Sequence, residues 1–254
     1  MEKSHKLELE KDIESEESIY RWLADFYRQI QKLRISMNNR IWQVNNRNDL
    51  TNTSASIKRQ ELHDDLFAME KALSKMMSQA IVDHPIWDYW LKDVRGVGPI
   101  LATQLVGLID DISKSPTISS LWKYAGQGVD QEGKADRKKK GEKLCYNFRL
   151  KVLMWNIGES FIKSNSPYKK IYDKAKERYV RIHPDWTKDH IHKCSMRKMN
   201  KIFLSHVWLI WREVEDLPTS QPYVIASEEG ECKMHTHFIS PWDMIEKKDE
   251  KART

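Results

Sequence analysis

The stretch VRGVGPILATQL, residues 94–105, places two of the chain's nine glycines, Gly96 and Gly98, on either side of one valine. Apolar residues flank the pair, and Pro99 follows it directly. Glycine tolerates a positive φ and lets another molecule approach the main chain, while proline favours the first turn of a helix. The pattern therefore predicts a short helix, a tight Gly-Val-Gly turn and a second helix.

A turn of this kind in front of a helix suits an anionic ligand. We expect the backbone N–H groups of Gly96, Val97 and Gly98 to point outward, next to the partial positive charge of the helix N-terminus. Such a combination binds phosphate oxygens. Ala102, one turn into the second helix, would let the two helices approach closely. The alternative interpretation is an ordinary helical corner without a ligand.

A second Gly-x-Gly pair, Gly126 and Gly128, is followed by a strongly basic loop. Gln127 stands where the first pair has an apolar valine, so we interpret the pair as a degenerate second copy of the hairpin. Phosphate contacts from the loop would position a nucleic acid without reading its bases, and a solvated basic surface is the alternative. The expected nucleic-acid-binding residues are Gly96, Val97, Gly98, Gly126, Gly128, Lys134, Arg137, Lys138, Lys139, Lys140, Lys143 and Arg149.

Upstream of the glycines, apolar residues repeat at steps of mostly four and three in two series. The first is Ile19, Leu23, Phe26, Ile30, Leu33, Met37 and Val44, and the second is Leu62, Leu66, Met69, Leu73, Met76 and Ala80. Such spacing is typical of a heptad seam on a long helix. With the polar connector 43–56 between them, the two series predict an antiparallel helical hairpin or coiled-coil arm, or one half of a dimeric bundle. Stripes that belong only to the core are the alternative.

Downstream, helical spacing of apolar residues returns over residues 146–162, 168–180 and 190–215. One strand is expected, at residues 222–226, and almost nothing else alternates as a strand does. The predicted fold class is therefore all-α. Three parts are expected: an acidic tip with the helical arm over residues 1–84, a helix-hairpin-helix domain over residues 85–216, and an irregular tail over residues 217–254.

Composition and charge narrow the class of protein. The 254 residues are 40% hydrophobic and hold three cysteines, which suits a globular chain without a disulfide framework. No apolar run is long enough to span a membrane, so we expect a cytoplasmic, nucleoid-associated protein without a membrane partner. The formal net charge is +6 although residues 1–18 hold seven acidic residues against three lysines. The body of the chain is therefore strongly basic and favours an anionic partner.

Histidines and cysteines toward the C-terminus offer a rival site. His190, Cys194, Cys232, His235 and His237 are ligand types that zinc accepts. Neither group has the spacing of a zinc finger, and on a helix His190 and Cys194 share a face without His192. We therefore predict no cofactor, with zinc as the alternative. Trp122 and Tyr124, close to the second glycine pair, are candidates for stacking on bases.

The segment LKDVRGVGPILATQLVGLIDDISKSPTISSLWKYAGQG, residues 91–128, is preceded by the helical arm and followed by the basic loop. It resembles the C-terminal domain of RNA-guided insertion-sequence transposases, which join a RuvC-like domain to a coiled coil and a helix-hairpin-helix domain. The similarity is best over residues 91–162. The resemblance implies a transposase-like protein that acts in transposition or recombination and binds DNA rather than RNA. The length of the helical arm separately predicts a homodimer that forms through it.

Two departures from that family concern its chemistry. The family uses an acidic, metal-binding RuvC-like domain, which this sequence does not contain. It also carries a nucleophilic serine before a glycine in the loop after the tyrosine-glycine hairpin, where this chain has Glu132 before Gly133. Glutamate cannot form a phosphoserine link. We therefore expect DNA binding without strand transfer, with a nuclease or recombinase subunit and a structural RNA-binding protein as the alternatives.

Overall fold

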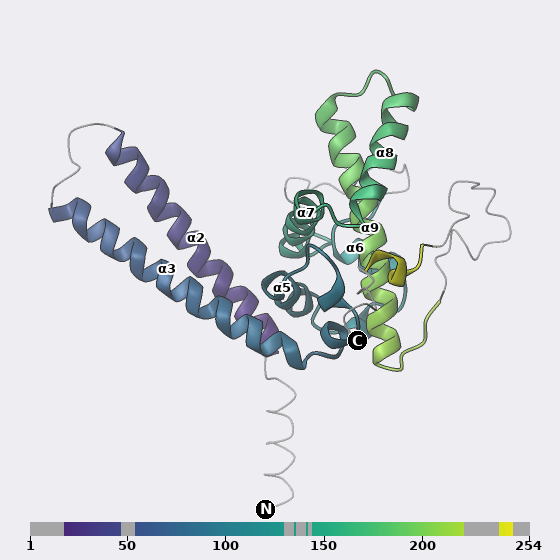
Figure 1. Ribbon diagram of the computed structural model, residues 1–254, viewed down its shortest axis with the longest axis horizontal. Coiled ribbons are helices and arrows are strands. Elements are labelled where there is room, and N and C mark those ends of the chain that lie inside the picture. The colour runs from purple at the N-terminus through teal and green to yellow at the C-terminus, as the bar shows by residue number, and fades with distance from the viewer. Residues whose placement is uncertain are drawn as a thin grey trace, which may run out of the picture.

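The computed structural model describes residues 18–46, 54–129, 135, 141, 144–220 and 239–245, and helices dominate them (Figure 1). The longer helices are α2 (Ile19–Asn45), α3 (Ser54–Ala80), α5 (Pro99–Ile109), α7 (Phe148–Lys163), α8 (Lys169–Ile182) and α9 (Lys188–Val214). The short ones are η1 (Ile81–Asp83), α4 (Pro85–Tyr89), η2 (Leu91–Asp93), η3 (Ile112–Lys114), α6 (Ile118–Tyr124) and η4 (Pro241–Met244). Within these residues the only β pairing is an isolated bridge between Val129 and Ala135. The all-α class is confirmed, whereas the expected strand 222–226 lies outside the described residues.

Local sequence explains where the helices of the body begin. The Asn147 side chain accepts the backbone N–H groups of Arg149 and Leu150 at the start of α7, and Thr187 accepts that of His190 at the start of α9. Asparagine and threonine are preferred at this position because they satisfy N–H groups that the first turn leaves without a partner. Both helix starts therefore have a side-chain cap.

Helix α9 is the centre of the body, with α4, α6, α7 and α8 packed around it. Trp208 and Trp211 on α9 and Trp90 before η2 are fully buried. The indole N–H of Trp208 donates to the carbonyl oxygen of Ser115 at 2.7 Å, and that of Trp90 donates to Pro241 at 3.2 Å. The second bond holds η4 against the core, so this part of the expected irregular tail belongs to the body.

Helices α2 and α3 form a long two-helix arm that extends away from the body (Figure 1). Its small apolar cluster consists of Leu23, Tyr27, Ile30, Leu73 and Met77. Between the helices, the buried Glu70 carboxylate accepts the Tyr27 hydroxyl at 3.2 Å and the Gln31 amide at 3.0 Å, and forms an ion pair with Arg34.

The heptad seams predicted for the arm are only partly correct. Leu23, Ile30 and Leu73 are buried, but Leu33 and Met69 are 56% and 45% exposed. Met77 rather than Met76 is buried, and Glu70 rather than Met69 lies between the helices. On α3, Leu66, Leu73 and Ala80 therefore pack as predicted, whereas Glu70 and Met77 take the places expected for Met69 and Met76.

The arm meets the body at α5. A Cβ on Gly107 would lie 2.4 Å from the carbonyl oxygen of Tyr20, so the backbones of α2 and α5 are in direct contact there. Arg21 pairs with Asp110 at 3.6 Å, and Arg149 forms an ion pair with Asp25. These contacts fix the direction in which the arm leaves the body.

Two buried histidines make the stability of the body depend on pH. His84 packs between the ring edges of Tyr20 and Trp211, and its Nδ1 has no hydrogen-bond partner. His206 contacts the Ile239 carbonyl through Nε2 at 2.9 Å and the Tyr168 hydroxyl through Nδ1 at 2.7 Å. Burial lowers the pKa of each to about 4 from an ordinary value near 6.5.

The unfolded chain takes up these two protons at a higher pH than the folded chain. The free energy of unfolding is therefore highest above about pH 6.5, where both histidines are neutral in either state. It falls as the pH decreases toward 4, by about 3 kcal/mol for each histidine. Urea unfolding at pH 7.5, 6 and 5 measures this loss. In His84→Phe, the part of this pH-dependent loss of stability that comes from His84 is expected to disappear. A pH dependence as large as that of the wild type would contradict the role given to His84.

Candidate nucleic-acid interface

The first glycine pair forms the predicted turn between two helical segments, although the first segment is irregular. The chain passes through the five residues of α4 and the 3₁₀ turn η2, then reverses at Gly96 and Gly98 into α5. Pro99 occupies the first position of α5, as expected, and Ala102 is fully buried. A hairpin before a regular second helix is therefore present, but a regular first helix is not.

The two glycines serve different purposes. Gly96 has a φ of +96°, and a Cβ there would lie 2.8 Å from the Ser164 hydroxyl and 3.0 Å from the Phe161 ring. The Ser160 hydroxyl on α7 donates to the Gly96 carbonyl at 2.6 Å, which fixes the turn against α7. Gly96 is therefore required by both its conformation and its surroundings.

Gly98 has an ordinary extended conformation, with φ −80° and ψ 171°, and precedes α5 as its N-cap. A Cβ at this position would have no heavy atom within 4 Å. The fold would therefore accept a side chain here. The open space in front of α5 is what distinguishes this glycine.

Backbone donors point to the same place. Among the described residues, the N–H groups of Gly98, Ile100 and Leu101 have no backbone acceptor, whereas that of Ala102 bonds to Gly98. The early N–H groups of a helix have no partner within it, and they carry the positive end of its dipole. The N-terminus of α5 therefore offers several donors to an anion at Gly98.

Val97 does not have the predicted role. Its N–H group donates to the Val94 carbonyl at 3.0 Å, and its side chain is 3% exposed within the core. The apolar residue between the glycines anchors the turn from inside. Its backbone donor is consumed by the turn itself, so the donors lie at Gly98, Ile100 and Leu101 instead.

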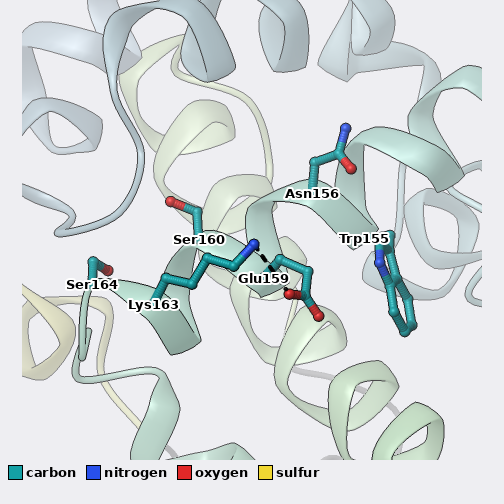
Figure 2. Close-up of a pocket in the computed structure, with 6 residues that line it drawn as sticks. All are labelled: Trp155, Asn156, Glu159, Ser160, Lys163 and Ser164. Atoms are coloured by element: carbon teal, nitrogen blue, oxygen red, sulfur yellow. Dashed lines mark ion pairs between the residues drawn. The ribbon is translucent and has the colours of Figure 1, made fainter. Parts of the chain in front are cut away.

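The surface around the turn is shallow and continuous with α7. One hollow is lined by the turn and its neighbours, including Lys92, Arg95, Gly98 and Ser160. A second hollow shares Ser160 and follows the exposed face of α7, where Figure 2 shows Trp155 at one end and Ser164 at the other. Lys163 pairs with Glu159 at 3.4 Å between them. Ser160 of α7 and Ser164, which follows α7 directly, were not predicted, because only the tertiary fold brings them to the turn.

The second glycine pair is not a second hairpin. Gly126 has a φ of +66° and ends α6, with its N–H donating to Lys123 and that of Gln127 donating to Trp122. This is the Schellman arrangement of a helix C-terminus. The next helix among the described residues, α7, begins at residue 148. The carbonyl groups of Gln127 and Gly128 accept from Arg197, so we do not assign this pair to phosphate binding.

The predicted basic loop lies largely outside the described residues, and this applies to Lys134, Arg137, Lys138, Lys139, Lys140 and Lys143, as well as to Glu132. Arg149 is described and forms an ion pair with Asp25 of α2. This ion pair joins the arm to the body, and the predicted contact of Arg149 with nucleic acid stays a prediction.

The predicted stacking residues are engaged within the fold. The Trp122 indole N–H donates to the Lys201 carbonyl at 2.9 Å, and the Lys201 ammonium lies 3.8 Å from the Trp122 ring centroid. The Tyr124 hydroxyl donates to the Leu108 carbonyl at 3.1 Å. One face of Trp122 is thus covered by a lysine, and the polar end of Tyr124 is bonded to the backbone.

In the described part of the chain, no group of three or more histidine, cysteine, aspartate or glutamate side chains is placed to bind a zinc ion. His190 and Cys194 do share a face of α9, with 3.6 Å between Nε2 and Sγ. His192 instead contacts the Tyr172 hydroxyl at 2.8 Å. The other candidates, Cys232, His235 and His237, lie outside the described residues.

Comparison of the chain with protein-family models, curated proteins and solved structures finds no match. None of the described helices combines the length and apolar character that crossing a membrane requires. The chain is thus defined by its own architecture: an all-α body with a projecting arm, and a glycine turn that leaves a helix N-terminus open at the surface.

Proposed function

We propose that this protein binds DNA by its phosphate backbone, at the glycine turn before α5. The observation that carries the proposal is the open position of Gly98 in front of three backbone donors. Backbone N–H groups at a helix N-terminus bind phosphate oxygens without regard to base sequence. The resemblance of residues 91–162 to RNA-guided insertion-sequence transposases supports a role in transposition or recombination. We propose that this chain binds DNA in that role without carrying out strand transfer itself.

The fixed position of the turn supports the proposal. Ser160 and the close fit of Gly96 against α7 hold the turn rigidly, so a ligand need not order it on binding. Lys92 and Arg95 add positive charge around the hollow, although Lys92 also pairs with Asp88 at 2.5 Å. A rigid, basic and open helix N-terminus favours a phosphate over a neutral ligand.

Fluorescence anisotropy with a labelled duplex DNA of about 30 base pairs tests the proposal. We expect binding that weakens steeply as salt rises, because released counterions drive such contacts. A matched RNA duplex serves as competitor, and we expect it to displace the DNA poorly. Absence of DNA binding at low salt would contradict the proposal, whereas equal competition by RNA would favour the structural RNA-binding alternative.

The enzymatic alternative has a separate test. We expect the protein to shift branched and duplex DNA without nicking either when Mg²⁺ or Mn²⁺ is added. A metal-dependent product would favour a nuclease or recombinase subunit. The anisotropy measurement does not report on this outcome, so the two assays are independent.

We further propose that the arm joins two copies of the chain. Trp42 on α2 and Phe67 on α3 are 64% and 54% exposed, and Leu33 and Ile57 are similarly open. Exposed apolar side chains on a projecting helical pair suit contact with a second, identical arm. Sedimentation equilibrium is expected to show a dimer that Trp42→Glu weakens, while Val180→Glu on α8 leaves it unchanged. A wild-type monomer at high micromolar concentration would contradict the proposal.

A further inference from the structure

Four cationic side chains lie on the packed helices α8 and α9, and α9 also packs against α6. Arg178 lies on α8, and Arg197, Lys198 and Lys201 lie on α9; we call these four residues the basic cluster. All four side chains are partly buried. None of them was among the residues predicted to bind nucleic acid, because the cluster depends on how α8 packs against α9.

Two members of the cluster, Lys201 and Arg197, are held by α6 and the residues that follow it. Lys201 rests on the ring of Trp122 from α6, with 3.8 Å between its ammonium and the ring centroid. Arg197 donates to the Gln127 carbonyl at 2.7 Å and to the Gly128 carbonyl. A cation over an indole face is favourable, and the attraction grows as water is excluded. The two side chains are therefore positioned rather than freely extended.

The cations act on one another. Burial and the neighbouring Arg197 lower the pKa of Lys201 to about 8, and burial and Arg178 lower that of Lys198. Within the described residues, no carboxylate forms an ion pair with either lysine. Desolvated cations beside like charges cost free energy, and an anion placed among them lowers that cost.

The basic cluster is distinct from the glycine turn. Arg197 contacts residues 127 and 128, and a Cβ on the adjacent Gly126 would meet Lys151 near the start of α7. Gly96 instead meets Ser164, just beyond the other end of α7. At 1.5 Å per residue along a helix, these two points are about 20 Å apart.

We propose that the basic cluster is a second contact for the phosphate backbone of DNA. The inference rests on the proposed function, since the ligand is the same, but it uses none of the residues of the glycine turn. A polyanion suits the cluster better than a small anion does, because the four cations are spread over two helices. Consecutive phosphates of a nucleic-acid backbone can contact several separated cations at once, whereas one small ion cannot.

The pH dependence of binding tests the cluster. A phosphate beside Lys201 favours its charged form, so the complex binds a proton that the free protein has begun to release at about pH 8. Anisotropy with a labelled duplex at constant ionic strength is expected to show affinity falling about tenfold from pH 7 to pH 9. Lys201→Arg, which stays charged, is expected to abolish most of this decrease and keep the affinity at pH 7.

The titratable neighbours of the cluster do not produce this signature. Burial raises the pKa values of Tyr179 on α8 and Cys194 on α9. Both side chains are unchanged in Lys201→Arg, so a decrease in affinity that either of them produced would persist in that variant. From α6, the packed side chain is that of Trp122, which does not titrate. If a titrating group elsewhere, such as the N-terminal amine, caused the decrease in DNA affinity between pH 7 and pH 9, Lys201→Arg would show the same decrease as the wild type. That result would overturn the proposal.

Removing the charge gives a second readout. Lys201→Gln is expected to weaken binding three- to tenfold at pH 7 and to reduce the slope of log affinity against log salt by about one. Lys71→Gln, on the exposed surface of α3, removes the same charge far from the cluster and should change neither quantity. Equal effects from the two variants would overturn the proposal.

Failure of this inference is distinguishable from failure of the proposed function. If Gly98→Asp weakens binding but Lys201→Arg keeps the full pH dependence, the turn binds DNA and the cluster does not. If Gly98→Asp binds as the wild type does and Lys201→Arg abolishes the decrease, the cluster binds DNA and the turn does not. A wild-type protein that binds no duplex at any pH overturns both.

Discussion

Gly98→Asp is expected to lower the affinity for duplex DNA at least tenfold while the folded structure remains intact. Gly98 is the N-cap of α5, in an extended conformation with open space around it. Aspartate is among the preferred N-cap residues, since its carboxylate accepts the second or third N–H of the helix. In this chain those donors belong to Ile100 and Leu101, so the carboxylate would occupy the phosphate site and also repel the phosphate.

Three substitutions at this position separate the causes. Gly98→Ala adds only a Cβ and is expected to bind nearly as well as the wild type. Gly98→Asn occupies the same donors without charge and should fall between alanine and aspartate. All three are expected to unfold at wild-type urea concentrations or slightly above, because the position is open. Wild-type DNA affinity in Gly98→Asp at moderate salt would show that phosphate is bound elsewhere.

Gly107→Ala is expected to destabilise the protein by about 3 kcal/mol or more, a loss of roughly 10 °C in melting temperature. The added Cβ would lie 2.4 Å from the carbonyl oxygen and 2.5 Å from the carbonyl carbon of Tyr20. These are backbone atoms of α2 and cannot rotate away. Alanine is intrinsically better in a helix by about 1 kcal/mol, but a clash between two main chains outweighs that gain.

The structural consequence of Gly107→Ala lies at the base of the arm. Separating α2 from α5 also loosens the ion pair between Arg21 and Asp110. Thermal and urea unfolding measure the loss, with Gly98→Ala as a glycine-to-alanine control in open space. A Gly107→Ala protein as stable as the wild type would mean that α2 does not contact α5 as described.

Local features of the candidate site could be predicted from the sequence. Gly96, Gly98 and Pro99 are close together in the chain, and their conformational preferences alone specify a turn followed by a helix. The support from Ser160 and Ser164 could not be predicted, because more than 60 residues separate these serines from the turn. The all-α class could be predicted for the same reason, from helical spacing within single segments.

Errors arose where one sequence pattern serves two structures. A Gly-x-Gly pair forms a hairpin at Gly96 but ends a helix at Gly126. A helix begins directly after the first pair, whereas a long polar stretch of sequence follows the second. In the arm, the apolar spacing of α3 gave a seam through Met69, whereas the structure places the carboxylate of Glu70 between the helices. The partners of Glu70 lie on the other helix, so the spacing of α3 alone did not reveal them.

The central claim is that the open N-terminus of α5 holds a DNA phosphate. Amide ¹H–¹⁵N NMR of the protein titrated with a short duplex tests it most directly, with Val97 as an internal reference because its N–H already bonds to Val94. We predict downfield proton shifts for Gly98, Ile100 and Leu101 that saturate with binding, while Val97 shifts little. Saturable DNA binding that leaves these three amides unmoved would contradict the claim.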